Sequence, residues 1–71
     1  MFDNYYVLKT SEYYLSEIEV IYTNKNELVK YTIDKEYKKL YSDFELAEED
    51  RKLIFIETGL NLEIKKFREV E

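Results

Sequence analysis

Carboxylates are the side chains of this sequence that could most readily do chemistry. Five of them fall within eight residues, with no base among them: Asp43, Glu45, Glu48, Glu49 and Asp50. The run Glu48-Glu49-Asp50 could bind a hard cation weakly, but it lacks the Asp/Asn alternation and the glycine of a calcium-binding EF-hand loop. Glu17 and Glu19 form a second pair, which we expect on one face of a strand. Paired carboxylates can hydrolyse glycosides, but a sheet this small offers no enclosed cleft.

The composition excludes most other kinds of catalytic and metal-binding chemistry. The chain contains no His, no Cys and a single Gly. This excludes the commonest general base, the commonest soft metal ligands and most nucleophile–base pairs. A glycine-rich phosphate loop cannot be built with one Gly. We therefore expect no enzyme, and no catalytic residue, metal or cofactor.

The charge balance points to a protein partner. The formal net charge is -5, from 16 acidic and 11 basic residues. This argues against direct binding of nucleic acid, which needs clustered Lys and Arg. Carboxylates along a rigid element can instead present charge as phosphates do, to a site built for nucleic acid. We expect the cluster Asp43–Asp50, together with Glu17, Glu19 and Asp34, to contact a basic protein such as a nucleic-acid-binding enzyme. The alternative is a solvated surface that serves solubility.

Eight tyrosines are the other unusual feature. The adjacent pairs Tyr5-Tyr6 and Tyr13-Tyr14 cannot both point inward on a strand, so at least one ring of each pair faces outward or faces a partner. Tyr is enriched at protein interfaces, and we expect Tyr6 and Tyr13 to act as anchors there. The alternative is that each ring is half-buried with its hydroxyl at the surface.

The length of 71 residues predicts one domain, residues 1–71. With neither disulfide nor zinc the fold must rely on packing, and a homodimer is one way to bury more surface. No apolar run approaches the ~20 residues of a membrane helix, and Met1–Phe2–Asp3 does not begin a signal peptide. Because the absence of Cys also fits a reducing compartment, we expect a cytoplasmic protein with no membrane partner.

The stretch 17–34 predicts a β-hairpin. Apolar residues fall at even positions in 17–23, where Ile21 breaks the rule, and at the odd positions Val29, Tyr31 and Ile33 in 27–34. Pairing must bring both sets to one face. A turn centred between Lys25 and Asn26 does so, and it predicts three pairs: Tyr22 opposite Val29, Val20 opposite Tyr31 and Ile18 opposite Ile33.

A preceding strand is predicted over Tyr5–Thr10, followed by a turn at Ser11-Glu12. This turn sets Leu8 opposite Leu15 and Tyr5 opposite Ile18. The first three strands then form a meander.

A helix is predicted over Asp34–Asp50, with Asp34 as its N-cap. Four apolar residues occur at i, i+3, i+4 and i+7, which is one stripe of a helix: Tyr37, Leu40, Tyr41 and Phe44. The alternative is a helix that begins at Ser42, because Ser42-Asp43-Phe44-Glu45 has the form of a capping box and the acids that follow would favour a helix start. We expect the longer helix, with a kink or break near Ser42.

The last third predicts strands. Leu53–Ile56 is apolar on both strand faces, as in a central strand or one at a dimer interface. Gly59 is expected at positive φ in a turn with Thr58, which sets Phe55 opposite Leu62 and Leu53 opposite Ile64. Leu60–Glu71 alternates like a strand, although its apolar residues also fit one face of a helix.

These elements predict an α+β fold: a small antiparallel sheet, made of a three-strand meander, then a helix, then a strand or hairpin, with the helix packed on one face. In size, acidity and tyrosine content the chain resembles small inhibitors from phages and mobile elements, including acidic mimics of DNA. This resemblance of composition implies a target such as a nuclease, a CRISPR effector or a repair glycosylase. The alternative function is a homodimeric structural or regulatory module, with Leu53–Ile56 at its seam.

Overall fold

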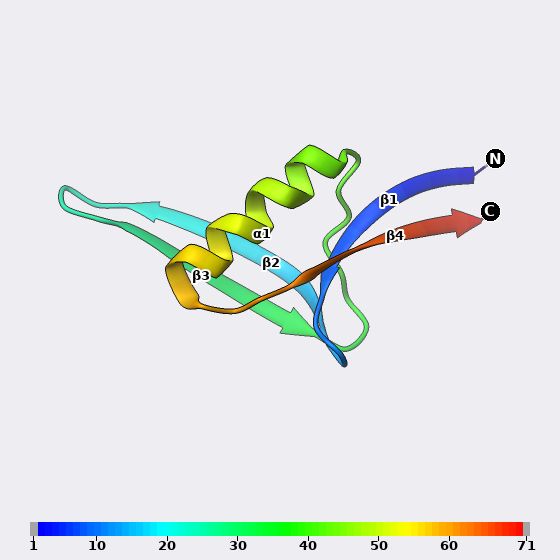
Figure 1. The fold of residues 1–71 in the computed structure, drawn as a ribbon, viewed down its shortest axis with the longest axis horizontal. Coiled ribbons are helices and arrows are strands. Elements are labelled where there is room, and N and C mark those ends of the chain that lie inside the picture. Colours follow the sequence, from blue (N-terminus) through cyan, green and yellow to red (C-terminus); the bar gives the residue numbers. More distant parts are fainter. Residues whose placement is uncertain (1, 71) are drawn as a thin grey trace.

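The fold is an antiparallel sheet with one helix on it (Figure 1). The computed structural model describes residues 2–70, and the side chains of residues 4–68. In chain order the elements are β1 (Phe2–Lys9), β2 (Tyr14–Tyr22), β3 (Glu27–Asp34), α1 (Phe44–Thr58) and β4 (Glu63–Val70). The strand order is β3-β2-β1-β4, and every neighbouring pair is antiparallel. The predicted α+β class is confirmed.

The predicted hairpin is formed by β2 and β3, but in a different register. Val20 lies opposite Val29 and Ile18 opposite Tyr31, so the predicted pairs were wrong by two residues. The hydroxyl of Thr23 fixes the turn one position earlier: it accepts from the N–H of Asn26 at 2.9 Å and donates to the Asn26 carbonyl at 2.9 Å. Residue parity cannot distinguish registers that differ by two residues, because both bring the same side chains to one face.

A β-bulge at Ser16 reverses the side-chain alternation of β2, so that odd-numbered residues before it face the same side as even-numbered residues after it. Leu15 pairs with Ile33 and Glu17 with Thr32, which leaves Ser16 as the extra residue. Its hydroxyl donates to the carbonyl of Thr32 at 3.0 Å. A bulge shifts the alternation of one strand by one position. Leu15, at an odd position, can therefore face the core together with the even-numbered Ile18.

The turn predicted at Ser11-Glu12 is confirmed, but the strands on either side of it separate at once. Lys9 pairs with Tyr14, in the register that was predicted, and the Thr10 N–H donates to the Tyr13 carbonyl at 2.8 Å. The predicted pairing of Tyr5 with Ile18 is wrong, because β1 and β2 pair only at Lys9 and Tyr14, whereas on its other edge β1 pairs along its whole length with β4. The sheet is therefore two ribbons, β2–β3 and β1–β4, which meet at one corner (Figure 1).

The segment between β3 and α1 fills the gap between the separating strands. The Lys39 N–H donates to the Leu15 carbonyl at 2.8 Å. Tyr41 forms an isolated bridge with Tyr6, with N–H to carbonyl distances of 2.8 and 2.9 Å. The carbonyl of Leu15 on β2, and both backbone groups of Tyr6 on β1, thereby gain partners.

The helix predicted over Asp34–Asp50 is wrong in its first half, because the backbone there bonds to strand edges. Asp34 does act as a cap, since its carboxylate accepts from the N–H groups of Glu36 and Tyr37 at 2.8 and 2.9 Å. It caps a turn, however, and no helix follows. The later start weighed from the sequence is nearly correct: Asp43, one residue after Ser42, is the N-cap and accepts from the N–H of Glu45 at 3.1 Å.

α1 continues through Leu53–Ile56, so the predicted strand there is wrong. An apolar run of four residues is compatible with either structure, and only Ile54 among the four is buried. The positive φ predicted for Gly59 is confirmed at 79°, but this residue ends the helix by donating its N–H to the Phe55 carbonyl at 2.9 Å. The predicted hairpin at Thr58-Gly59, with its pairs Phe55–Leu62 and Leu53–Ile64, is therefore wrong.

The strand predicted within Leu60–Glu71 is confirmed over Glu63–Val70. β4 pairs with β1, which sets Leu8 opposite Ile64 and Tyr5 opposite Phe67. These pairs point alternately to the two faces of the ribbon.

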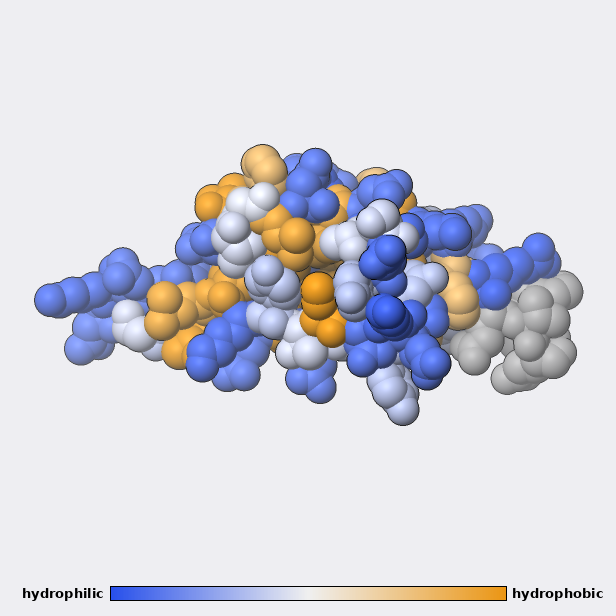
Figure 2. Space-filling model, turned by 90° about the horizontal axis from the view of Figure 1, so that it is seen from below, coloured by the Kyte–Doolittle hydropathy of each residue, from blue (hydrophilic) through white to orange (hydrophobic). Residues whose placement is uncertain are grey.

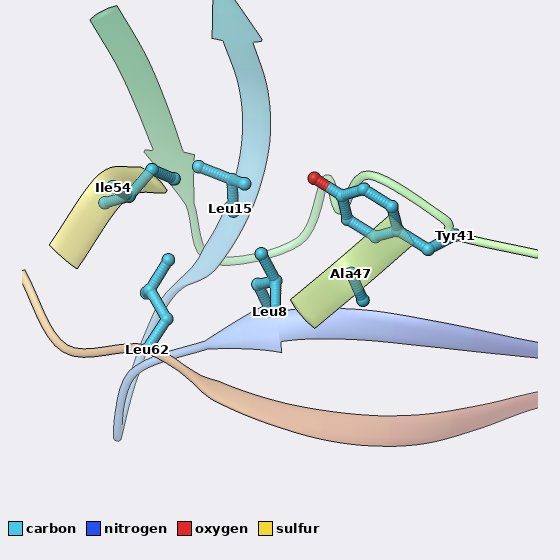
Figure 3. Packing of buried hydrophobic residues seen from close by; sticks show 6 residues of the cluster. All are labelled: Leu8, Leu15, Tyr41, Ala47, Ile54 and Leu62. Atoms are coloured by element: carbon cyan, nitrogen blue, oxygen red, sulfur yellow. The ribbon is translucent and has the colours of Figure 1, made fainter. Parts of the chain in front are cut away.

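The core lies at the corner where the two ribbons and the helix meet (Figure 3). It is formed by Leu8, Leu15, Tyr41, Ala47, Ile54 and Leu62. Full burial of a Leu or Ile side chain contributes about 1.5–3 kcal/mol. α1 contributes only Ala47 and Ile54 to the fully buried set, so the helix is attached to the sheet by a narrow stripe.

Fewer side chains cover the face of the sheet that lies away from the helix. Val7 is fully buried, and its neighbour across the ribbon is Lys65. The ammonium of Lys38 lies 4.6 Å from the ring centre of Tyr14 and 5.1 Å from that of Phe67. Each cation–π contact of this kind contributes roughly 0.5–1 kcal/mol at an exposed site. Lys38 thus joins the two ribbons on the side away from the helix.

Replacement of the helix C-cap tests the end of α1. Gly59→Ala would force a Cβ into the left-handed region, although no atom lies within 4 Å of the added carbon. We expect a loss of about 1 kcal/mol in the free energy of unfolding, measured by denaturant titration. Gly59→Asn is the control and should cost less, because Asn tolerates this conformation. Equal stability of Gly59→Ala and the wild type would contradict this helix end.

Candidate functional site

The predicted partner-binding residues are distributed over three places in the fold. Glu17 and Glu19 lie on β2, Asp34 ends β3, and the remaining carboxylates lie at or after the start of α1. Their availability for a partner therefore differs, and it depends on which of them already bind groups of the chain itself.

Glu17 and Glu19 are exposed on the β2–β3 ribbon. Glu19 lies directly opposite Lys30, and Glu17 lies opposite Thr32. These four residues line an open groove, together with Ser16, Ile18, Tyr31 and Lys39. The two lysines make this groove mixed in charge, so it is not an acidic surface.

Two of the predicted carboxylates are helix or turn caps. Asp34 accepts from the backbone of Tyr37 and Glu36, and these N–H groups hold the pKa of its carboxyl below the usual value. Asp43 is the N-cap of α1. Both carboxylates thus already stabilise local structure.

Asp50 is engaged with the core. Its carboxylate accepts a hydrogen bond of 2.6 Å from the hydroxyl of Tyr41, whose residue is 4% exposed. Burial, and then the hydrogen bond to Asp50 and the negative charge of that group, raise the pKa of the Tyr41 hydroxyl well above its usual range. This pair ties the segment before α1 to the second turn of the helix.

Glu48 is paired along the helix. Arg51 donates to it through Nε, at 3.3 Å, and through a guanidinium Nη, and Lys52 Nζ lies 3.9 Å away. The hydrogen bond from Arg51 is the main cause that lowers the pKa of the Glu48 carboxyl. Its charge is therefore partly compensated within the chain.

Glu45 and Glu49 are the two predicted acids of α1 that remain uncompensated. Both are exposed, and the structure gives them no side-chain hydrogen bond or ion pair within the described residues. With Lys52 and Ile56 they occur at i, i+4, i+7 and i+11, which is one stripe of a helix. All four are exposed, so this stripe is the outward side of α1.

Apolar side chains flank this outward stripe. Phe44 and Phe55 are 48% and 49% exposed on one side, Leu46 is 50% exposed on the other, and Ile56 is 74% exposed between them. Phe44 also lines an open hollow at the start of the helix with Glu45, Glu48, Glu49 and Lys52. We call the exposed set Phe44, Glu45, Leu46, Glu49, Lys52, Phe55 and Ile56 the outer face of α1.

The apolar part of this face was missed in the sequence. The sequence predicts a strand over Leu53–Ile56, and a strand there does not align Phe55 and Ile56 with the acids. The signal was present: Phe44 and Phe55 differ by 11 residues, about three helical turns, and therefore lie on one side of a helix that runs through both. Figure 2 shows that, on the face it displays, hydrophobic side chains reach the surface in several places among hydrophilic ones.

The two predicted tyrosine anchors are both half-buried. Tyr6 packs against the core, and its ring meets that of Phe44 edge-on at 5.6 Å between ring centres. Tyr13 lies under the ammonium of Lys35, 5.8 Å from its ring centre. The most exposed tyrosines within the described side chains are Tyr22 and Tyr37, at 77% and 74%. Tyr6 supports the outer face of α1 through Phe44.

Within residues 2–70, no group of three or more acidic residues is arranged to hold a metal ion. Over the same residues, no helix has the length and apolar character needed to cross a membrane. Comparison with family models, with curated proteins and with solved structures gives no match to this chain. The functional conclusion therefore rests on the residues themselves.

The Tyr41–Asp50 pair predicts a dependence of stability on alkaline pH. The folded state raises the pKa of Tyr41, so its stabilising effect is complete below the usual tyrosine value of about 10 and is lost as the pH rises above that value. Tyr41→Phe should cost about 1 kcal/mol at neutral pH through the lost hydrogen bond. It should also lose less stability than the wild type between pH ~8 and ~11.

Urea unfolding across this pH range measures both effects. Tyr37→Phe is the matched control, since Tyr37 is 74% exposed, and it should follow the wild type. An equally steep alkaline loss in Tyr41→Phe and in the wild type would show that this hydroxyl is not the group responsible.

Proposed function

We propose that this protein is an interaction module that binds a basic protein partner through the outer face of α1. The observation that carries the proposal is the composition of that face: two carboxylates without an ion pair among the described residues, Glu45 and Glu49, and one ammonium, Lys52, lie among four large apolar side chains that are about half-exposed or more. Exposed aromatic and large apolar side chains beside charged groups are typical of protein-binding sites.

The charges and the apolar groups have separate roles in such an interface. Phe44, Leu46, Phe55 and Ile56 would supply the area that is removed from water, and aromatic anchors dominate binding energy in many complexes. Glu45 and Glu49 would orient a basic partner and accelerate its association, because opposite charges steer encounter. Glu48 is held by Arg51, so it contributes less.

The narrower form of this proposal is inhibition of a nucleic-acid-binding enzyme, such as a nuclease, a CRISPR effector or a repair glycosylase. A surface of that enzyme built for phosphates would accept the carboxylates of α1, and the chain would compete with nucleic acid for it. The net charge of -5 supports this form. In this form of the proposal the chain acts in the cytoplasm and itself binds neither nucleic acid nor a membrane.

A charge-reversal experiment tests the proposed interface. The chain is immobilised and used to capture proteins from a lysate of the source cells, which are then eluted with increasing salt. Binding should weaken as salt rises from ~0.1 M to ~0.5 M, because exposed charges are screened. The variant Glu45→Lys/Glu49→Lys should bind the captured partner on the order of ten-fold more weakly. The partner should release labelled duplex DNA when the wild-type chain is added.

The matched control reverses two exposed acids elsewhere, Glu12 and Glu63. Glu12→Lys/Glu63→Lys has the same net charge as the helix variant and should retain nearly full binding. Equal loss in both variants would mean that net charge, rather than the outer face of α1, determines binding. Binding that is indifferent to salt would contradict the role of the carboxylates, and a captured partner that keeps its DNA would contradict the narrower form.

A further inference from the structure

The two outer strands of the sheet differ in how well their edges are protected. β3 and β4 are the outer strands. β4 carries four charged residues among its first six, Glu63, Lys65, Lys66 and Arg68, and charges of this kind prevent another strand from pairing with an edge. Between its two ends β3 carries a single charge, Lys30, while Leu28, Tyr31 and Ile33 are each more than a third exposed. β3 is thus the edge that is open to another strand.

The hydrogen bonding of the hairpin indicates which groups of β3 are available. The Thr23 N–H donates to the Asn26 carbonyl, and the carbonyl of Thr32 accepts from Ser16 on β2. Because peptide groups alternate in direction along an antiparallel strand, the even-numbered residues of β3 bond toward β2. The N–H and C=O groups of Val29, Tyr31 and Ile33 point to the open edge.

We propose that β3 pairs with β3 of a second copy of this chain, antiparallel, about a two-fold axis at Tyr31. In this register the two Tyr31 residues are neighbours, and Val29 lies opposite Ile33 of the second copy. Glu27 of each copy comes near Lys35 of the other, the residue that directly follows β3 and whose ammonium lies 5.8 Å from the ring centre of Tyr13; this pair occurs twice. Aromatic, apolar and opposite-charge pairs across strands all stabilise a sheet.

Charge complementarity selects this register over its neighbours. In this pairing an odd-numbered residue must lie opposite an odd-numbered one, and an even-numbered residue opposite an even-numbered one. The two-fold axis can therefore move along β3 only from one residue to the next. An axis at Lys30 would set two lysines opposite each other, which is unfavourable. An axis at Thr32 would set Val29 opposite Lys35, and it would pair Lys30 with Asp34, whose carboxylate is already bound to two backbone N–H groups.

The dimer would have one continuous sheet of eight strands, with both helices on the same side. Its seam does not involve the outer face of α1, so it is independent of the proposed partner binding. It also differs from the seam predicted at Leu53–Ile56, which is helical. Because the contact is small, we expect a dissociation constant on the order of 10 μM.

Sedimentation velocity over a concentration range from ~1 to ~500 μM, bracketing that value, tests the dimer. Glu27→Lys and Lys35→Glu should each weaken association on the order of ten-fold, because each creates two like-charge pairs. The double variant Glu27→Lys/Lys35→Glu should return to within about three-fold of the wild type. Glu27 begins β3 and Lys35 directly follows its end, so about eight residues of extended chain, or ~26 Å, separate them within one copy, and this rescue can arise only between copies.

Two further variants ensure that the test does not depend on the correct folding of any single variant. Tyr31→Lys would set two ammonium groups at the axis and should abolish dimerisation, whereas Tyr22→Lys, on β2, should not. Glu45→Lys/Glu49→Lys should leave association unchanged, which separates this seam from the helix surface. A wild type that stays monomeric at the highest concentration would overturn the proposal, as would a double variant no better than the single ones.

Discussion

The separation of β1 from β2 after a single residue pair is the constraint on which the rest of the structure depends. Where Lys9 pairs with Tyr14, the two ribbons come close enough for Leu8 and Leu15 to share one core. Beyond that point each ribbon has an unpaired inner edge. Tyr41 and Lys39 supply the missing backbone partners, and the helix then covers the corner with Ile54.

A core at a corner is necessarily small. Most of the length of each ribbon extends away from it, and the molecule measures 46 × 22 × 15 Å along its principal axes. Small domains bury a modest fraction of their surface in any case, and this shape reduces that fraction further. Apolar side chains that would be covered in a rounder fold are therefore left at the surface, on α1 and on β3.

This geometry explains why the acids of α1 differ in what they can do. Asp43, Glu48 and Asp50 each satisfy a group of the chain itself, namely the helix start, Arg51 and Tyr41. Carboxylates near a helix start also stabilise it against its dipole. Glu45 and Glu49 point away from all of these partners, and they lie where the apolar residues of the helix are also exposed.

Much of the fold could be predicted from residue parity, and the remainder could not for definite reasons. The alternation of apolar and polar residues predicted the β2–β3 hairpin and β4. It could not choose between registers of the hairpin, which the hydrogen bonds of the Thr23 hydroxyl determine. The bulge at Ser16 could not be predicted, because only the demand of the core for both Leu15 and Ile18 reveals it. Gly59 correctly indicated a positive φ, yet a helix end and a hairpin turn both need one.

The candidate site was predictable only in part. The five clustered acids were visible in the sequence, and the structure then separated them by tertiary contacts such as the hydrogen bond from Tyr41 to Asp50, which joins residues nine apart. The apolar members of the outer face depended on a correct helix assignment. Leu53–Ile56 is short enough to suit a strand or a helix equally, and the competing strand prediction removed Phe55 and Ile56 from consideration.

α1 is attached to the sheet by one narrow stripe and presents Phe44, Leu46, Phe55 and Ile56 outward. Ile54→Ala and Ile56→Ala, compared by denaturant unfolding, test this arrangement most directly, since the two substitutions are identical and lie one helical half-turn apart. Ile54 is fully buried, and its loss should cost about 2–5 kcal/mol. Ile56 is 74% exposed, and its loss should change the free energy of unfolding by less than about 0.5 kcal/mol. Comparable losses at both positions would mean that the segment is covered on both sides, and would contradict the outward apolar face.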